Sequence, residues 1–236
     1  MQVLVSVNSV PEAEMVLSAD VRLIDLKETS HGALAALDLN LSKSIIHEVS
    51  LYRQQHPHAD IIVSATIGDD CASVQVLREL IQSRLDIGVN VIKLPQTIWA
   101  DAAYAPVIKE FLFRQVKLIA VLSADHVSGK ETIDRILHEL ANTAYWGVMV
   151  DTTQKAKPLT ALISLNLLDF FVKAAKSLKL YVGLAGGLQL EQFDQLADLS
   201  PDYLGFRSGL CVNQRREQPL LAEKIHLVTS KVSAFC

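Results

Sequence analysis

Lysine and aspartate side chains stand at the ends of apolar segments in this sequence, where they could perform amine chemistry. Asp25 lies in the apolar segment Leu23–Leu26, and Lys27 follows it by two positions. In a β-strand, residues i and i+2 point to the same face, so we expect Asp25 and Lys27 to project together as an ion pair. Such a pair is costly to bury, which suggests a function; a surface salt bridge where the strand meets a loop is the alternative.

A second lysine, Lys93, ends the apolar segment that begins at Asn90. If Lys27 and Lys93 enter one partly dry cleft, their like charges and their desolvation both lower their pKa values. A lysine whose pKa falls below about 10.4 has a larger fraction of free amine. That amine can form a Schiff base with a carbonyl or act as a general base. The alternative is that each lysine simply extends from a strand end into solvent.

A third acidic position follows another apolar segment. Asp151 comes directly after Val148–Val150, and Lys155 lies four residues further along the chain. We expect Asp151 to orient a lysine or to relay protons. The structural alternative is an Asx-turn or a helix cap formed by Asp151.

Two glycine-rich segments near the C-terminal end could bind phosphate. They run over residues 183–187 and 205–209, and the second contains an arginine. In many barrels the loops after the seventh and eighth strands cradle a phosphate with backbone N–H groups, and arginine adds a bidentate contact. Simple turns are the alternative. The candidate phosphate-binding residues are Gly186, Gly187, Arg207, Ser208 and Gly209.

The elements that must position these groups follow a repeating pattern. Short segments rich in Val, Ile and Leu alternate with amphipathic helical patterns, which indicates a parallel sheet covered by helices. Eight such units predict an α/β fold, a single (β/α)8 TIM barrel, whereas a doubly wound open sheet usually has fewer strands. Barrel active sites lie at the carboxyl ends of the strands, which is where the charged side chains stand. The expected strands are Gln2–Ser6, Leu23–Leu26, Asp60–Ala65, Asn90–Leu94, Val116–Leu122, Gly147–Val150, Leu180–Leu184 and Tyr203–Phe206.

The expected helices fill the intervals between these strands and follow the last one. We place them at Pro11–Ala19, Ser42–Gln55, Cys71–Asp86, Asp101–Arg114, Lys130–Ala141, Leu165–Ser177, Leu190–Leu199 and Pro219–Val232. Gly68, Asp69 and Asp70 are expected to form a turn and the N-cap of the third helix.

Composition narrows the class of protein. The 236 residues, half of them apolar, suit one catalytic domain over residues 1–236. No apolar stretch approaches the ~20 residues of a membrane helix. The net charge of −4 gives no general attraction for nucleic acid. Three scattered cysteines argue against a disulfide framework or a zinc site and suit the reducing cytoplasm. No metal site, Walker sequence, GxGxxG or GxSxG motif is present.

Taken together, these segments resemble the (5-formylfuran-3-yl)methyl phosphate synthases, which serve the synthesis of methanofuran-type C1 carriers in methanogens and methylotrophs. The resemblance covers nearly the whole chain and is weaker around Ala124–His126 and after Gly209. It rests on Ile24-Asp25-Leu26-Lys27, Gly32-Ala33-Leu34, Ser64-Ala65-Thr66-Ile67-Gly68-Asp69, Ile92-Lys93, Met149-Val150-Asp151-Thr152, Leu184-Ala185-Gly186 and Gly205-Phe206-Arg207.

This resemblance implies a barrel enzyme that condenses two molecules of the triose phosphate glyceraldehyde 3-phosphate, with loss of one phosphate and two waters. It implies that Lys27 forms the Schiff base, that Lys93 accepts a proton, and that Asp25, Asp151 and Lys155 assist. No metal or organic cofactor, nucleic acid or membrane would be involved. From its size, we expect the barrel to form a homo-oligomer through its outer helices.

Two other readings stay open. The first is another phosphate-binding barrel lyase, which would resemble a class I aldolase or orotidine-monophosphate decarboxylase. The decarboxylase array continues to an aspartate three residues after the lysine, where this chain has Ser30. The second is a barrel that binds a sugar phosphate without catalysis, although binding alone requires no array of two lysines and two aspartates.

Overall fold

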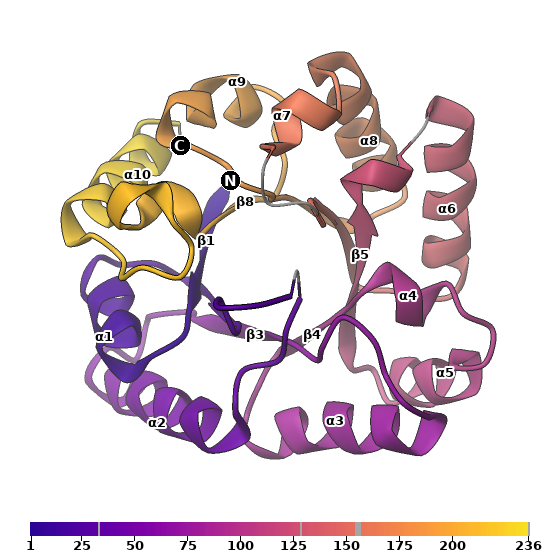
Figure 1. Cartoon of the computed structure of the whole chain (residues 1–236), viewed down its shortest axis with the longest axis horizontal. Coiled ribbons are helices and arrows are strands. Elements are labelled where there is room, and N and C mark those ends of the chain that lie inside the picture. Colours follow the sequence, from indigo (N-terminus) through magenta and orange to yellow (C-terminus); the bar gives the residue numbers. More distant parts are fainter. Residues whose placement is uncertain (33, 128, 154–156, 236) are drawn as a thin grey trace.

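Eight parallel strands close into a barrel in the computed structural model, which describes residues 1–32, 34–127, 129–153 and 157–235. Each strand pairs with its neighbours in chain order, and β8 pairs with β1 (Figure 1). This closure confirms the predicted (β/α)8 TIM barrel. The strands are β1 (Gln2–Val7), β2 (Leu23–Leu26), β3 (Ile62–Thr66), β4 (Val91–Leu94), β5 (Lys117–Ser123), β6 (Gly147–Asp151), β7 (Tyr181–Leu184) and β8 (Tyr203–Phe206).

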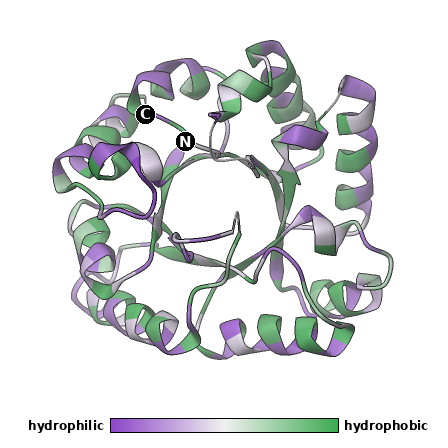
Figure 2. Ribbon diagram, in the orientation of Figure 1, coloured by the Kyte–Doolittle hydropathy of each residue, from purple (hydrophilic) through white to green (hydrophobic). Residues whose placement is uncertain are grey.

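The covering helices lie close to their predicted positions, and two short ones were not predicted, α4 and α7. In Figure 2 hydrophobic and hydrophilic residues alternate along these helices, as one buried and one exposed face require. The helices are α1 (Val10–Ser18), α2 (Leu39–Gln55), α3 (Val74–Asp86), α4 (Gln96–Trp99), α5 (Ala105–Phe113), α6 (Lys130–Asn142), α7 (Leu159–Leu162), α8 (Leu165–Ser177), α9 (Phe193–Ala197) and α10 (Ala222–Phe235). None of the described helices is long and apolar enough to cross a membrane.

The start of α3 differs from the prediction. Its N-cap is Ser73, whose hydroxyl accepts a hydrogen bond from the backbone N–H of Val76. The expected cap at Asp69 or Asp70 is therefore wrong. The Asp69 carboxylate instead accepts from the backbone N–H of Leu34 at 2.6 Å, which fixes the segment between β2 and α2.

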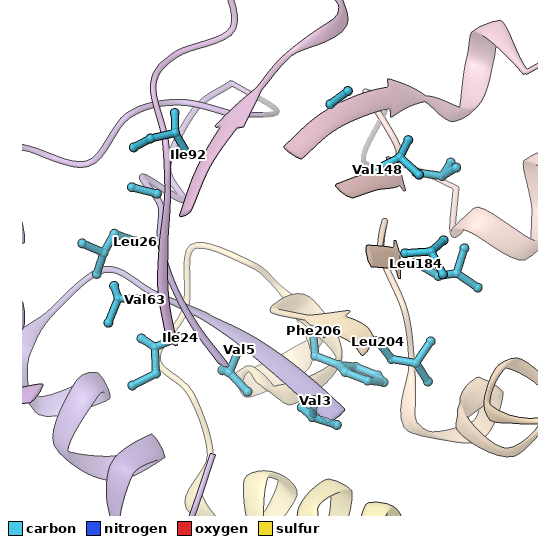
Figure 3. Close-up of a cluster of buried hydrophobic side chains, with 14 of the residues drawn as sticks. Val3, Val5, Ile24, Leu26, Val63, Ile92, Val148, Leu184, Leu204 and Phe206 are labelled. Carbon is cyan, nitrogen blue, oxygen red and sulfur yellow. The ribbon is translucent and has the colours of Figure 1, made fainter. Parts of the chain in front are cut away.

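Successive side chains along each strand point alternately out of the barrel and into it. They form an outer layer, which is apolar, and an inner layer. Along β2, Ile24 and Leu26 point outward to the helices, as Figure 3 shows together with Val5 and Val63. Asp25 belongs to the opposite face, which points into the barrel. The outward side chains form the main hydrophobic core with the buried faces of the helices.

Aromatic rings fill the barrel interior near the amino ends of the strands. Trp146 stacks on Tyr181, and Tyr181 stacks on Tyr203, with ring centroids 4.4 and 5.4 Å apart. Gly183 makes room for this arrangement, because a Cβ there would lie 2.0 Å from the Tyr203 ring. The interior is thus closed at the amino ends of the strands. The buried lysine and aspartate side chains, Asp25, Lys27, Lys93 and Asp151, lie toward the carboxyl ends.

Candidate active site

A cavity of about 550 Å³ opens at the carboxyl ends of the strands. Its walls combine the charged strand-end residues, the two glycine-rich segments and a further segment between β8 and α10. This is the position that barrel enzymes use for catalysis. The chemically active residues that line it include Asp25, Lys27, Lys93, Asp151, Arg207 and Arg216.

The deepest part of the cavity holds an ion pair between Lys93 and Asp25. The Lys93 Nζ lies 2.9 Å from an Asp25 carboxylate oxygen, and each side chain is only 2% exposed. Two hydroxyl groups also donate to this carboxylate, Ser6 Oγ at 3.1 Å and Ser64 Oγ at 2.6 Å. The strand register explains this, since Ser6 on β1 and Ser64 on β3 both lie directly beside Asp25 on β2.

The environment of Lys93 favours its neutral amine. Burial lowers the pKa of Lys93 below its ordinary value; the carboxylate of Asp25 opposes this effect, and the charge of Lys27 adds to it. A larger fraction of this amine is therefore unprotonated than in an exposed lysine. Lys93 is thus suited to accept a proton.

A second ion pair lies nearer to the opening. The Lys27 Nζ is 3.3 Å from a carboxylate oxygen of Asp151, and these side chains are 11% and 8% exposed. The other oxygen of Asp151 accepts from the backbone N–H of Thr152 at 2.7 Å. Lys27 immediately follows β2 and Asp151 ends β6, so this pair crosses the barrel interior.

These partners differ from the expected ones. The sequence predicted that Asp25 and Lys27 would pair with each other, but the structure pairs Asp25 with Lys93 and Lys27 with Asp151. In a closed barrel, side chains from several strands converge on one axis. A group across the interior can therefore be nearer than a group two residues away on the same strand.

The glycine-rich segments also line the cavity. Gly186 and Gly187 have φ angles of 108° and 60°, in the region that favours glycine. A Cβ on Gly186 would lie 2.8 Å from the backbone nitrogen of Thr152, so this position needs glycine for packing as well. Ser208 belongs to the cavity wall beside them, and Gly209 packs against the carbonyl oxygen of Leu188.

Arg207 lines the cavity, and its side chain also makes several contacts within the protein. Its guanidinium forms an ion pair with Glu12 of α1 at 2.5 Å. It also donates to the carbonyl oxygens of Ser6, Arg216 and Gln218, at 3.2, 2.9 and 3.1 Å. Four of its N–H···O contacts are thus made to the protein itself. The side chain fastens the segment after β8 to the barrel and to α1.

Two groups of functional residues were not assigned a role from the sequence. Ser6 and Ser64 hold Asp25, and their inward position could have been found from the period of two along β1 and β3. Arg216 reaches the carbonyl oxygens of Gly32 and Glu28, at 2.8 and 3.1 Å. No sequence pattern marks these contacts, because they depend on the path of a loop.

Lys155 and Asp125 belong to the chain segments that follow β6 and β5. Lys155 is outside the residues that the structure describes. Asp125 accepts hydrogen bonds from the hydroxyl groups of Thr153 and Ser123, and the bond from Thr153 is the main cause of its lowered pKa. Within the described ranges, no group of three or more His, Cys, Asp or Glu side chains is placed to hold a metal ion.

Solved structures with a similar fold include an isomerase and a pyrophosphorylase. Phosphoribosyl anthranilate isomerase from Thermus thermophilus superposes with a TM-score of 0.66, covers all of both chains and is 14% identical. Thiamine phosphate pyrophosphorylase from Pyrococcus furiosus has a TM-score of 0.61 and 12% identity, and it covers 99% of this chain and 96% of its own. At these identities the similarity establishes the fold alone.

Sequence relatives are more specific. The family model described as 4-HFC-P synthase matches residues 3–229. A protein of Methylorubrum extorquens named "Putative (5-formylfuran-3-yl)methyl phosphate synthase" is 34% identical over 220 residues, which cover 93% of this chain and 86% of that protein. The (5-formylfuran-3-yl)methyl phosphate synthase of Archaeoglobus fulgidus is 29% identical over 229 residues, 91% of this chain and 92% of its own. The chain therefore belongs to the 4-HFC-P synthase family.

Proposed function

We propose that this enzyme condenses two molecules of glyceraldehyde 3-phosphate to (5-formylfuran-3-yl)methyl phosphate, releasing one phosphate and two waters, for the synthesis of a methanofuran-type C1 carrier. The family supports the product, and the paired lysines support the chemistry. The observation that carries the mechanism is the convergence of two lysine–aspartate ion pairs on one cavity. Such an array can supply both a nucleophilic amine and a base.

Lys27 is the Schiff-base lysine in this proposal. Its side chain is 11% exposed, against 2% for Lys93, so it is the more accessible of the two amines. Its attack on the aldehyde of the first substrate expels water and leaves an iminium. Asp151, 3.3 Å away, holds the amine in place and can exchange protons with it during this step.

Lys93 is the proton acceptor. An iminium acidifies the neighbouring C2, and transfer of the C2 proton to Lys93 gives an enamine. The enamine then expels phosphate from C3, which leaves C3 electrophilic. The lowered pKa of Lys93 supports its role as proton acceptor, because an amine must be unprotonated to accept a proton.

The structure of the furan product specifies the later bonds. Its carbon skeleton requires a bond between C3 of the first substrate and C2 of the second. The second substrate gives up its C2 proton to solvent so that C2 can attack the electrophilic C3. The C2 oxygen of the first substrate then closes the ring onto C1 of the second, and two waters are lost. Hydrolysis of the imine returns Lys27 and consumes the water that imine formation released. Lys155 is assigned an assisting role from the family resemblance.

The phosphate of the first substrate is assigned to the backbone of the two glycine-rich segments, at Gly186, Gly187, Ser208 and Gly209. The position of Gly186, Gly187 and Ser208 on the cavity wall supports the assignment. The side chain of Arg207 contributes indirectly, by holding the second segment in place.

Turnover tests the proposal. Purified protein incubated with glyceraldehyde 3-phosphate should form a furan chromophore and release one phosphate for every two substrate molecules consumed. The variant Lys27→Arg, incubated under the same conditions, measures how much furan and phosphate form without catalysis. Substrate that binds and is recovered unchanged would instead indicate a sugar-phosphate-binding barrel.

A further inference from the structure

Among the described residues of the cavity wall, one cationic side chain lacks the carboxylate partner that the others have. Apart from Arg216, each cationic side chain on the described part of the cavity wall has a carboxylate partner within 4.0 Å. Arg216 forms no such ion pair with a described residue and adds one positive charge to the opening. The balanced pairs are Lys27–Asp151, Lys93–Asp25, Arg207–Glu12 and Arg215–Glu217.

Arg216 also occupies a distinctive place in the fold. It comes from the segment between β8 and α10, and its guanidinium donates to the carbonyl oxygens of Glu28 and Gly32 in the segment between β2 and α2. Figure 1 shows the segment after β2 running toward the middle of the barrel before it returns to α2. Arg216 thus joins two loops that border the opening.

The guanidinium is only partly satisfied by these contacts. Two of its five N–H groups donate to described protein acceptors, and both acceptors are neutral carbonyl oxygens. Burial lowers the pKa of Arg216; the carboxylates of Asp151, Asp69 and Glu217 oppose this effect, and the charge of Arg207 adds to it. Among the described residues, none of these three carboxylates forms an ion pair with Arg216. A partly desolvated cation without a counter-ion favours the binding of an anion. Guanidinium and phosphate match in geometry as well as in charge.

We propose that Arg216 binds the phosphate of the second triose phosphate. This inference rests on the proposed function, which brings two phosphates into one cavity and assigns the first to the glycine-rich segments. Arg216 provides the second anchor, on the segment between β8 and α10. Its contacts to the carbonyl oxygens of Glu28 and Gly32 hold the guanidinium in place at the opening.

Binding stoichiometry tests this assignment without turnover. Calorimetry with glycerol 3-phosphate, which has no aldehyde, should give two molecules per chain for the unsubstituted protein and one for Arg216→Gln. Arg135→Gln is the matched control, since Arg135 lies exposed on α6 with Glu139 as its partner at 3.9 Å, and it should retain two. A single site in the unsubstituted protein, or two sites in Arg216→Gln, would overturn the inference.

A purely structural role for Arg216 gives a different result. Loss of its two carbonyl contacts would lower the melting temperature but leave both binding sites. If Arg216 binds phosphate, Arg216→Gln should raise KM for glyceraldehyde 3-phosphate by about 100-fold, as loss of a charged hydrogen bond predicts, and Arg216→Lys should recover part of this.

Adduct formation separates this inference from the proposed function. Borohydride should still trap the first substrate on Lys27 in Arg216→Gln, because that substrate uses the other anchor. Failure of the unsubstituted protein to form a furan would refute the proposed function. Furan formation with unchanged KM in Arg216→Gln would refute only the role of Arg216.

Discussion

The two lysine–aspartate pairs of the cavity use the same residue types in different surroundings. Lys93 and Asp25 lie deep in the barrel, 2.9 Å apart and almost fully buried, with two serine hydroxyl groups on the same carboxylate. Lys27 and Asp151 lie 3.3 Å apart, and Lys27 keeps 11% of its side chain exposed. The deep pair and its two serines come from four strands, β1 to β4, whereas the shallow pair joins the end of β2 to the end of β6 across the barrel interior.

This difference indicates a division of labour. A buried amine with a lowered pKa is suited to take a proton, and a substrate aldehyde would reach it only with difficulty. An accessible amine beside a carboxylate is suited to form a covalent bond. If the division is right, substitutions in the two pairs will separate covalent chemistry from proton transfer and from stability.

The largest effect is expected for Lys27→Arg. Arginine keeps the positive charge opposite Asp151 but cannot readily form an imine, so kcat should fall by about 10⁴-fold or more. Furan formation from glyceraldehyde 3-phosphate measures this loss. An unchanged melting temperature would show that the fold is retained, and near-normal turnover would rule out the covalent role.

Lys93→Met should come next. Methionine fills a similar volume without a base, so kcat should fall by about 10²–10⁴-fold, the range for loss of general base catalysis. Borohydride should still trap substrate on Lys27, because imine formation precedes the proton transfer. Loss of the adduct together with turnover would mean that the two lysines do not have separate roles.

The aspartates should differ in their effect on stability. Asp25→Asn leaves the buried Lys93 without its counter-ion, which should lower the free energy of unfolding by about 3–5 kcal/mol. Asp151→Asn leaves Lys27 near the opening, and we expect a loss of about 1–2 kcal/mol. Urea unfolding of both variants measures the comparison. Equal losses would show that depth does not distinguish the pairs.

The smallest effect is a dependence of stability on pH. Because the pKa of Lys93 is lowered in the folded protein, the unfolded chain binds more protons between that pKa and about 10.4. The contribution of Lys93 to stability is therefore lowest below its folded pKa and rises with pH across this window, by about 1.4 kcal/mol for each unit of pKa lowering.

A variant without the deep pair isolates this dependence. Asp25→Asn combined with Lys93→Met removes both titrating groups. The free energy of unfolding of the unsubstituted protein, relative to this variant, should increase as the pH is raised from 7 toward 10. A constant or decreasing difference would contradict the lowered pKa.

The sequence was sufficient for the barrel because each strand is a continuous apolar segment with a polar end. The same pattern identified Asp25, Lys27, Lys93 and Asp151 as cavity residues, since the carboxyl ends of all parallel strands meet on one side. The period of two could not predict which lysine pairs with which aspartate. That choice depends on side chains that cross the interior from β4 and β6.

The contacts of the loop arginines could not be predicted from the sequence either. Arg207 was expected to contact phosphate, and the structure adds four contacts that were not expected, to Glu12 and to three carbonyl oxygens. Arg216 was given no role, although it lines the cavity. Backbone carbonyl groups occur at every residue and leave no signature in a sequence. The path of the segment after β8 decides which of the two arginines pairs with a described carboxylate.

Borohydride trapping tests the central claim most directly. The protein is incubated with glyceraldehyde 3-phosphate, reduced with borohydride, digested and mapped by mass spectrometry. The proposed division of labour predicts a stable adduct on Lys27 and none on Lys93. An adduct on Lys93, or turnover without any trapped lysine, would contradict it.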